Sequence, residues 1–181
     1  VHSPSERWSQ AQTANVSLGQ GSDLVSPLQL AMVYAAVANG GTAYYPRLIE
    51  KVTGADGLPL SEPPPEVPSA PRVRARLSDA GITPEELEVV RNGFWKVVNA
   101  DDGPGGGGTA HKARLPGGIV AGKTGTAQAQ LHGKQDTVAW FVGFAPYDHP
   151  RYVVCVLLQG GVPGVSVAAP FASRILEQTH R

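Results

Sequence analysis

Residues 121–128 read AGKTGTAQ, and they place one lysine and two threonines among small residues. The apolar residues 119–121 predict a strand that runs into this segment. The two glycines of the segment carry no β-carbon, so a ligand can lie directly against the main chain. Lys123 is a compact cation with three donors, and the threonine hydroxyl groups can face a carboxylate or a carbonyl. The segment therefore predicts one wall of a cleft for an anionic ligand that carries amide groups.

The residues after this segment predict a sheet around it. Residues 138–145 (VAWFVGFA) and 152–158 (YVVCVLL) are apolar runs typical of strands, and a turn-like stretch with two prolines separates them. The polar residues 128–136 predict the connection of a hairpin. Three successive strands with short connections are most simply an antiparallel meander. Residues 167–177 predict an amphipathic helix that lies across the sheet.

Two further helices have clear start signals. Residues 26–27 (Ser-Pro) supply a cap and a first-turn proline, and the apolar side chains of 28–38 cover most of the circumference. This helix is therefore predicted to be largely buried, and residues 39–41 (Asn-Gly-Gly) end it. Residues 83–86 (Thr-Pro-Glu-Glu) predict the start of another helix, with apolar residues at helical spacing through 87–98. The chain is thus predicted to be α+β, with helices covering a small antiparallel sheet of three C-terminal strands.

Three connections separate these elements. Residues 1–21 are polar and rich in turn-forming types, and they predict a loop that leads into the fold. Residues 54–71 are dense in proline and predict an exposed, partly extended loop. Residues 101–118 contain a run of glycines and predict a flexible connection. Residues 44–52 have strand-like content, but Pro46 confines that strand to an edge or a connection.

Composition excludes several classes of function. The chain of 181 residues carries 15 basic and 15 acidic residues, so no net field draws it to nucleic acid or to an acidic membrane surface. Its apolar content of 41% supports a folded globule, either one domain or a large part of a bigger one. No run approaches the roughly twenty apolar residues of a membrane helix. If the parent protein is anchored, we expect the anchor to lie upstream.

The sequence predicts neither a disulfide nor a metal site. Cys155 is the only cysteine, and its apolar surroundings predict a small buried side chain in place of a nucleophile. The five histidines stand in polar stretches without the spacing of metal ligands, and they are His2, His111, His132, His149 and His180. No bound metal and no cofactor are therefore expected.

One sequence pattern predicts a phosphate-binding loop where residues 121–128 predict a strand that forms the wall of a ligand cleft. Residues 117–124 (GGIVAGKT) satisfy the pattern G-x-x-x-x-G-K-[ST] of the phosphate-cradling loop. That loop should follow a buried strand and run straight into a helix. Here residues 103–116 contain no apolar run, residues 119–121 are apolar where the loop should be, and Gly125 is a poor helix former. A nucleotide-binding module is therefore the most distant of the alternatives.

A series of sequence blocks carries a family resemblance. In order along the chain they are GQG, SPLQLAMVYAAVANGGTAYYPRL, GTA, VAGKTGTAQ, VAWFVGFAP and VAAPFASRIL. Together they closely resemble the C-terminal half of the transpeptidase domain of class B penicillin-binding proteins, with the elongation type nearest. The resemblance extends from about Asn15 onward and departs mainly in the proline-rich loop and in residues 103–108. It implies part of a transpeptidase or β-lactamase-like fold and serine acyl transfer in peptidoglycan synthesis.

The resemblance also implies roles for the lysine segment. Lys123 would hold the carboxylate of the ligand and bias the protonation of the catalytic serine and lysine. Thr124 and Thr126 would donate hydrogen bonds to the ligand, and Gly125 would leave space for it beside the strand. The backbone N–H of Thr126 would be one of the two oxyanion-hole donors. The ligand would be a peptidoglycan stem peptide or a β-lactam.

No serine of the chain fits the nucleophile of this family. None has a lysine three positions later or an asparagine two positions later, as the Ser-x-x-Lys and Ser-x-Asn motifs require. The serines are Ser3, Ser5, Ser9, Ser17, Ser22, Ser26, Ser61, Ser69, Ser78, Ser166 and Ser173. We therefore expect residues 1–181 to be the C-terminal part of one transpeptidase domain, with both motifs upstream and with no activity by itself.

The missing part has a structural consequence. Family members place a strand from the start of the domain beside the final strand, here residues 152–158. We expect that edge to be unpaired in this chain and to pair with the missing half or with another chain. A non-catalytic binding or assembly fragment on the same fold is the second alternative for function. The resemblance also implies a place at the extracytoplasmic face of the bacterial inner membrane.

Overall fold

The computed structural model of the chain describes residues 8–20, 24–61, 70–101, 107–131, 133–160 and 164–180. The helices are α1 Gln10–Ser17, α2 Pro27–Ala38, α3 Pro84–Asn99 and α4 Gly164–His180. The strands are β1 Thr42–Tyr44, β2 Val73–Arg76, β3 Ala121–Leu131, β4 Lys134–Ala145 and β5 Tyr152–Gln159. Short 3-10 turns occupy Leu77–Ala80, His111–Ala113 and Pro116–Gly118.

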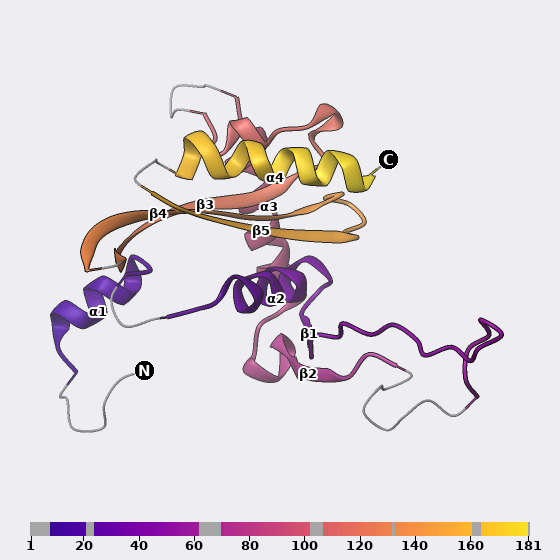
Figure 1. The fold of residues 1–181 in the computed structure, drawn as a ribbon. Coiled ribbons are helices and arrows are strands. Elements are labelled where there is room, and N and C mark those ends of the chain that lie inside the picture. Colours follow the sequence, from indigo (N-terminus) through magenta and orange to yellow (C-terminus); the bar gives the residue numbers. More distant parts are fainter. Residues whose placement is uncertain are drawn as a thin grey trace.

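The C-terminal strands form the predicted antiparallel meander in the order β3-β4-β5. Helix α4 lies across one face of this sheet, and α2 packs on the other (Figure 1). Helix α3 stands beside β3 and contributes side chains to the clusters on both faces, among them Phe94 on the α2 side and Val98 on the α4 side. This arrangement confirms the α+β class and the helix across the sheet.

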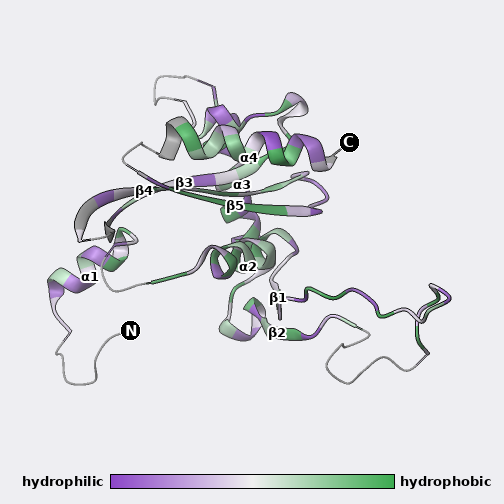
Figure 2. Cartoon of the chain, in the orientation of Figure 1, coloured by the Kyte–Doolittle hydropathy of each residue, from purple (hydrophilic) through white to green (hydrophobic). Residues whose placement is uncertain are grey.

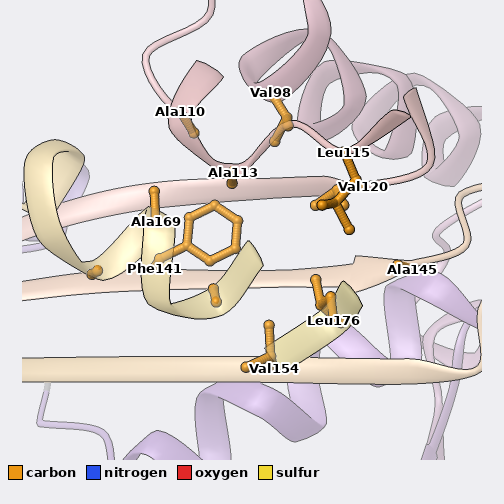
Figure 3. Packing of buried hydrophobic residues seen from close by; sticks show 12 residues of the cluster. Val98, Ala110, Ala113, Leu115, Val120, Phe141, Ala145, Val154, Ala169 and Leu176 are labelled. Carbon is orange, nitrogen blue, oxygen red and sulfur yellow. The ribbon is translucent and has the colours of Figure 1, made fainter. Parts of the chain in front are cut away.

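Strand alternation divides the core into two layers. Phe141 of β4 is fully buried on the α4 side, where the small residues Ala169 and Ala172 let the helix approach closely (Figure 3). Phe144 of the same strand is fully buried on the α2 side and belongs to a cluster with Tyr34. The hydropathy of the ribbon reflects this for β5, which is hydrophobic along most of its length (Figure 2).

The prediction that α2 is largely buried is wrong for one side of the helix. Ser26 caps it and Pro27 begins it as predicted, and Tyr34 is buried against the sheet. Leu28 and Val33, however, are each 57% exposed. The sequence pattern is apolar all round, but the elements that contact α2 in the described part of the chain leave the side chains of Leu28 and Val33 exposed.

The predicted loop of residues 1–21 contains the helix α1. Ser9 caps it, and the backbone N–H of Ser9 donates a hydrogen bond to the side-chain oxygen of Gln12 at 2.7 Å. This Ser-x-x-Gln capping box was the signal that could have revealed the helix. No residue of α1 is buried, which explains why its polar sequence resembled a loop.

The hairpin connection of residues 128–136 is also shorter than predicted. Strand β3 continues to Leu131 and β4 begins at Lys134, so most of this polar stretch is paired strand. Pairing between two long strands supplies backbone hydrogen bonds whatever the polarity of the side chains, and it overrides their weak strand preference.

The connections at 54–71 and 101–118 agree in part with prediction. Residues 54–61 and 70–71 contain no helix or strand, and residues 62–69 and 102–106 lie outside the described ones. The described part of 101–118 carries two 3-10 turns. In the 44–52 stretch, only Tyr44 belongs to a strand, β1, and its partner β2 was not predicted.

Two side chains fix the end of α3 to the start of β3. The Asn99 amide donates to the carbonyl oxygens of Trp95 and Val120, at 3.0 and 2.7 Å. The guanidinium of Arg114 donates to the carbonyl oxygens of Asn99 and Ala100, which no helical N–H can reach. Asn99 thus joins the end of α3 to the residue before β3, and Arg114 joins it to the connection between them, so both help to position the lysine segment.

Gly93 of α3 is a site where a substitution should stabilise the fold. A β-carbon built there has no heavy atom within 4 Å, so Gly93→Ala meets no steric obstacle. We expect the variant to raise the free energy of unfolding by about 1 kcal/mol, because alanine loses less backbone entropy in a helix. Urea titration followed by circular dichroism measures this, and a fall in stability would contradict it.

Candidate functional site

Lys123 projects from β3 on the α2 side of the sheet. It lies opposite Val142 of β4, a residue of the cluster on that side, and its own side chain is exposed. The ammonium donates a hydrogen bond to the carbonyl oxygen of Thr124 at 2.9 Å. This bond to its own strand holds the cation close to the backbone, while the remaining N–H groups stay available to a ligand.

The two threonines project from the opposite side of β3. Thr124 lies opposite Phe141, and Thr126 lies opposite Ala139. Thr124 is only 8% exposed, whereas Thr126 is exposed. The two threonine residues therefore differ in exposure, a difference that their residue type does not predict. The role of Thr124 toward a ligand stays a prediction.

The two glycines of the segment have different surroundings. A β-carbon on Gly122 would lie 2.6 Å from both the Phe141 ring and the carbonyl oxygen of Val142, so the close pairing of β3 and β4 requires glycine here. A β-carbon on Gly125 would meet only the Trp140 Cβ, at an ordinary 3.6 Å. The pairing of β3 and β4 therefore does not require glycine at position 125, and the role of Gly125 beside a ligand stays a prediction.

The site is a strand edge. β3 is the terminal strand of the sheet, and within the described residues no other strand pairs with its outer side. Its main-chain N–H and C=O groups on that side are available for an extended ligand to pair with. A ligand along the edge can contact side chains from both faces, so the opposite directions of Lys123 and Thr126 do not exclude their action on one ligand.

The same geometry removes the nucleotide-binding alternative. The Gly-Lys-Thr of residues 122–124 lies inside the regular strand β3 and pairs with β4. A phosphate-cradling loop would be irregular and would lead directly into a helix. Here an eleven-residue strand occupies that position.

Cys155 is less buried than predicted. Cys155 is half-buried on β5, and burial raises the pKa of its thiol, which disfavours the nucleophilic thiolate. His111 and His149 are exposed. Among the residues that the structure describes, no three histidine, cysteine or acidic side chains gather as a metal site would require.

A cavity of about 460 Å³ opens where β3 begins, and Trp95, Gly118 and Tyr147 are among its lining residues. None of the four predicted site residues lines it. Beside it, the Tyr147 hydroxyl donates to the Glu88 carboxylate at 2.8 Å, and burial, followed by this bond, raises the pKa of Tyr147. Sequence reasoning missed this cluster, because its members are 59 residues apart.

The chain is similar to known proteins in sequence and in structure. The family model described as the penicillin binding protein transpeptidase domain matches residues 2–177. The peptidoglycan D,D-transpeptidase MrdA of Haemophilus influenzae is 33% identical over 94% of this chain and 26% of its own length. The penicillin-binding protein PbpB of Mycolicibacterium smegmatis is 36% identical over 93% of this chain and 26% of its own length. The chain thus spans about a quarter of these curated relatives.

A solved structure is similar as well. Penicillin-binding protein A of M. tuberculosis, in its imipenem acyl-enzyme complex, superposes with a TM-score of 0.71. It is 26% identical in sequence, and the match covers 94% of this chain and 35% of that one.

Proposed function

Because the chain belongs to the penicillin-binding protein transpeptidase domain family, we propose that it forms the ligand-binding part of a peptidoglycan D,D-transpeptidase. In this proposal the outer edge of β3 receives a peptidoglycan stem peptide or a β-lactam. The observation that carries it is an exposed lysine on a strand edge that no described strand pairs with, two residues from Gly125, where an added β-carbon would meet only the Trp140 Cβ at an ordinary contact distance.

The proposed roles follow from the chemistry of the segment. The Lys123 ammonium attracts the ligand carboxylate, and this attraction would strengthen where the upstream part of the domain shields the exposed lysine from water. The exposed Thr126 supplies a hydroxyl and a backbone N–H, and the N–H stabilises the oxyanion that forms when a carbonyl is attacked. Gly125 keeps the strand surface open for the ligand.

The nucleophile in this proposal comes from outside residues 1–181. No serine here has the spacing of the family motifs, so the proposed acyl acceptor belongs to an upstream segment of a longer protein. That protein would act in the cell envelope, on the extracytoplasmic side. Within the described part of the chain, no helix combines the length and the apolar character needed to cross a membrane.

Strand β5 supplies a proposed contact for that upstream part. It is the other terminal strand of the sheet, and no strand pairs with its outer edge among the described residues. The nearby apolar side of α2, with Leu28 and Val33 exposed, would be covered by the same segment. A strand added at β5 would satisfy the open backbone groups and bury the apolar surface together.

The sharpest test of this proposal uses a fluorescent penicillin. We expect no covalent label on residues 1–181 alone, because acylation requires an activated serine. Adding the upstream segment, joined or as a separate polypeptide, should produce a label that a mass spectrum places on an upstream serine. A label on the isolated chain would contradict the assignment of the nucleophile. The absence of label in the joined protein would favour the non-catalytic alternative.

A further inference from the structure

The cavity at the start of β3 has no role in the proposed transpeptidase function, and none of residues 123–126 lines it. Its wall is built by three segments, which are the C-terminal half of α3, the turn that leads into β3, and the connection from β4 to β5. Its volume of about 460 Å³ falls in the range of small-molecule sites, which combine an apolar wall with a few polar groups. We call it the β3-entry cavity.

Two aromatic rings form a corner in this wall. The ring centroids of Trp95 and Tyr147 lie 6.3 Å apart, and the ring planes are tilted by 47°. The indole N–H of Trp95 donates to the carbonyl oxygen of Gly118 at 2.8 Å, and the Tyr147 hydroxyl donates to the Glu88 carboxylate at 2.8 Å. Because these bonds already orient both rings, an apolar group can pack against them without first ordering them.

The turn beside the aromatic corner is built from residues without side chains. Gly117 and Gly118 both line the cavity, and both have a left-handed backbone, with φ of 78° and 64°. A β-carbon on Gly118 would lie 3.6 Å from the Trp95 ring, directly beside the corner. The glycines therefore keep the space next to the aromatic corner open.

Opposite charges stand on different segments of the wall. Asn92 and Lys96 of α3 are four residues apart, so they lie on one face of the helix, one turn from each other. Asp148 brings a carboxylate from the connection between β4 and β5. All three side chains are exposed. The described ion pairs involve other residues, so neither Lys96 nor Asp148 has a charged partner in the described part of the chain.

This pair of unlike charges selects the kind of ligand. A simple anion in the cavity would be attracted by Lys96 and repelled by Asp148, and a simple cation would meet the reverse. A molecule that carries both charges gains from both residues. Its ammonium would also suit the ring faces, which attract cations. Burial and the bond to Glu88 raise the pKa of Tyr147, and the negative charge of Asp148 adds to this, so that carboxylate acts close to the ring.

We propose that the β3-entry cavity binds a free amino acid with an apolar side chain. Lys96 and Asn92 hold its carboxylate, Asp148 holds its ammonium, and its side chain packs against Trp95 and Tyr147. The polar groups set the orientation, and the aromatic corner selects an apolar side chain over a polar one. The proposal does not depend on the transpeptidase function, because the two sites share no residue.

The test titrates the full chain of 181 residues, labelled with ¹⁵N, and follows its amide and indole NMR signals. The probes are phenylalanine, N-acetylphenylalanine, which keeps only the carboxylate, and phenylalaninamide, which keeps only the ammonium. We expect phenylalanine to shift the indole signal of Trp95 and the amide signals of the cavity wall. It should bind about fivefold more tightly than either analogue, the ratio expected for one exposed ion pair. Equal affinities, or no shifts in the wall at the highest soluble concentration, would overturn the proposal.

Variants assign each end of the ligand. Lys96→Gln should weaken phenylalanine and N-acetylphenylalanine by about fivefold without weakening phenylalaninamide. Asp148→Asn should instead weaken phenylalanine and phenylalaninamide. The matched controls Lys112→Gln and Asp79→Asn change exposed charges outside the cavity and should leave all affinities unchanged. Lys96→Arg keeps the charge and should keep most of the binding. Unchanged affinities in both cavity variants, or an equal loss for all three probes, would contradict the assigned contacts.

A neutral sugar tests the other class of ligand that packs against aromatic rings. N-acetylglucosamine carries no charge, so we expect it to bind more weakly than phenylalanine and to be indifferent to Lys96→Gln and Asp148→Asn. If it shifts the same signals at lower concentrations than phenylalanine does, the assigned ligand class is wrong.

Discussion

The substitution Gly122→Ala should destabilise the protein more than any other single substitution in residues 121–128. We expect it to lower the free energy of unfolding by about 3 kcal/mol. The added β-carbon would lie 2.6 Å from the Phe141 ring and 2.6 Å from the Val142 carbonyl oxygen. Phe141 is fully buried and cannot move aside without disturbing the α4 layer. The carbonyl belongs to the backbone of β4, so the strand pair itself would have to open.

Gly125→Ala is the matched control for this prediction. It places the same methyl group three residues further along the same strand, where the nearest atom is Trp140 Cβ at 3.6 Å. We expect its stability to stay within about 0.5 kcal/mol of the parent. Urea unfolding of both variants measures the difference. Equal stability of the two would show that the Gly122–Phe141 contact does not constrain the sheet.

Gly125→Ala also separates folding from ligand binding. If the proposed function is correct, its methyl group occupies space that the ligand needs. In the joined protein that carries the upstream segment, the variant should therefore fold normally and acylate more slowly.

Lys123→Ala should reduce the rate of acylation of that joined protein by a penicillin by roughly 100-fold to 1000-fold. The physical reason is the loss of the positive charge that the proposal places beside the ligand carboxylate and the reacting groups. Lys123 is exposed and its described bond is to a neighbouring backbone carbonyl, so stability should change little. Stopped-flow or gel-based labelling with a fluorescent penicillin gives the second-order rate constant.

Lys112→Ala is the control for charge alone, because Lys112 is an exposed lysine outside the strand. Its acylation rate should equal that of the parent. Lys123→Arg should recover only part of the rate, since a planar guanidinium does not replace a compact ammonium in a confined site. An unchanged rate for Lys123→Ala, with the label still on the upstream serine, would remove Lys123 from the proposed site.

The features that the sequence predicts correctly are mostly those specified by neighbouring residues. The starts of α2 and α3 were predicted because Ser26 and Thr83 each precede a proline and cap the helix through nearby atoms. The meander was predicted because apolar runs of strand length follow one another with short connections. The capping box of α1 was an equally local signal, and it was overlooked because the polar sequence around it suggested a loop.

Features that depend on contacts between residues far apart in the sequence could not be predicted from such local patterns. The uncovered side of α2 could not be predicted, because burial depends on what packs against the helix and not on its own apolar pattern. The pairing of β1 with β2 was missed for the same reason, since the two strands are separated by the proline-rich stretch.

The sequence by itself determined that Lys123, Thr124, Gly125 and Thr126 lie on one strand at the start of an antiparallel meander. It also determined that their order resembles the ligand-binding motif of one protein family. Only the tertiary structure decided the difference between Gly122 and Gly125 and the burial of Thr124. The reason is that residue types and spacing specify local conformation, whereas register and packing against β4 and α4 specify which atoms meet each side chain.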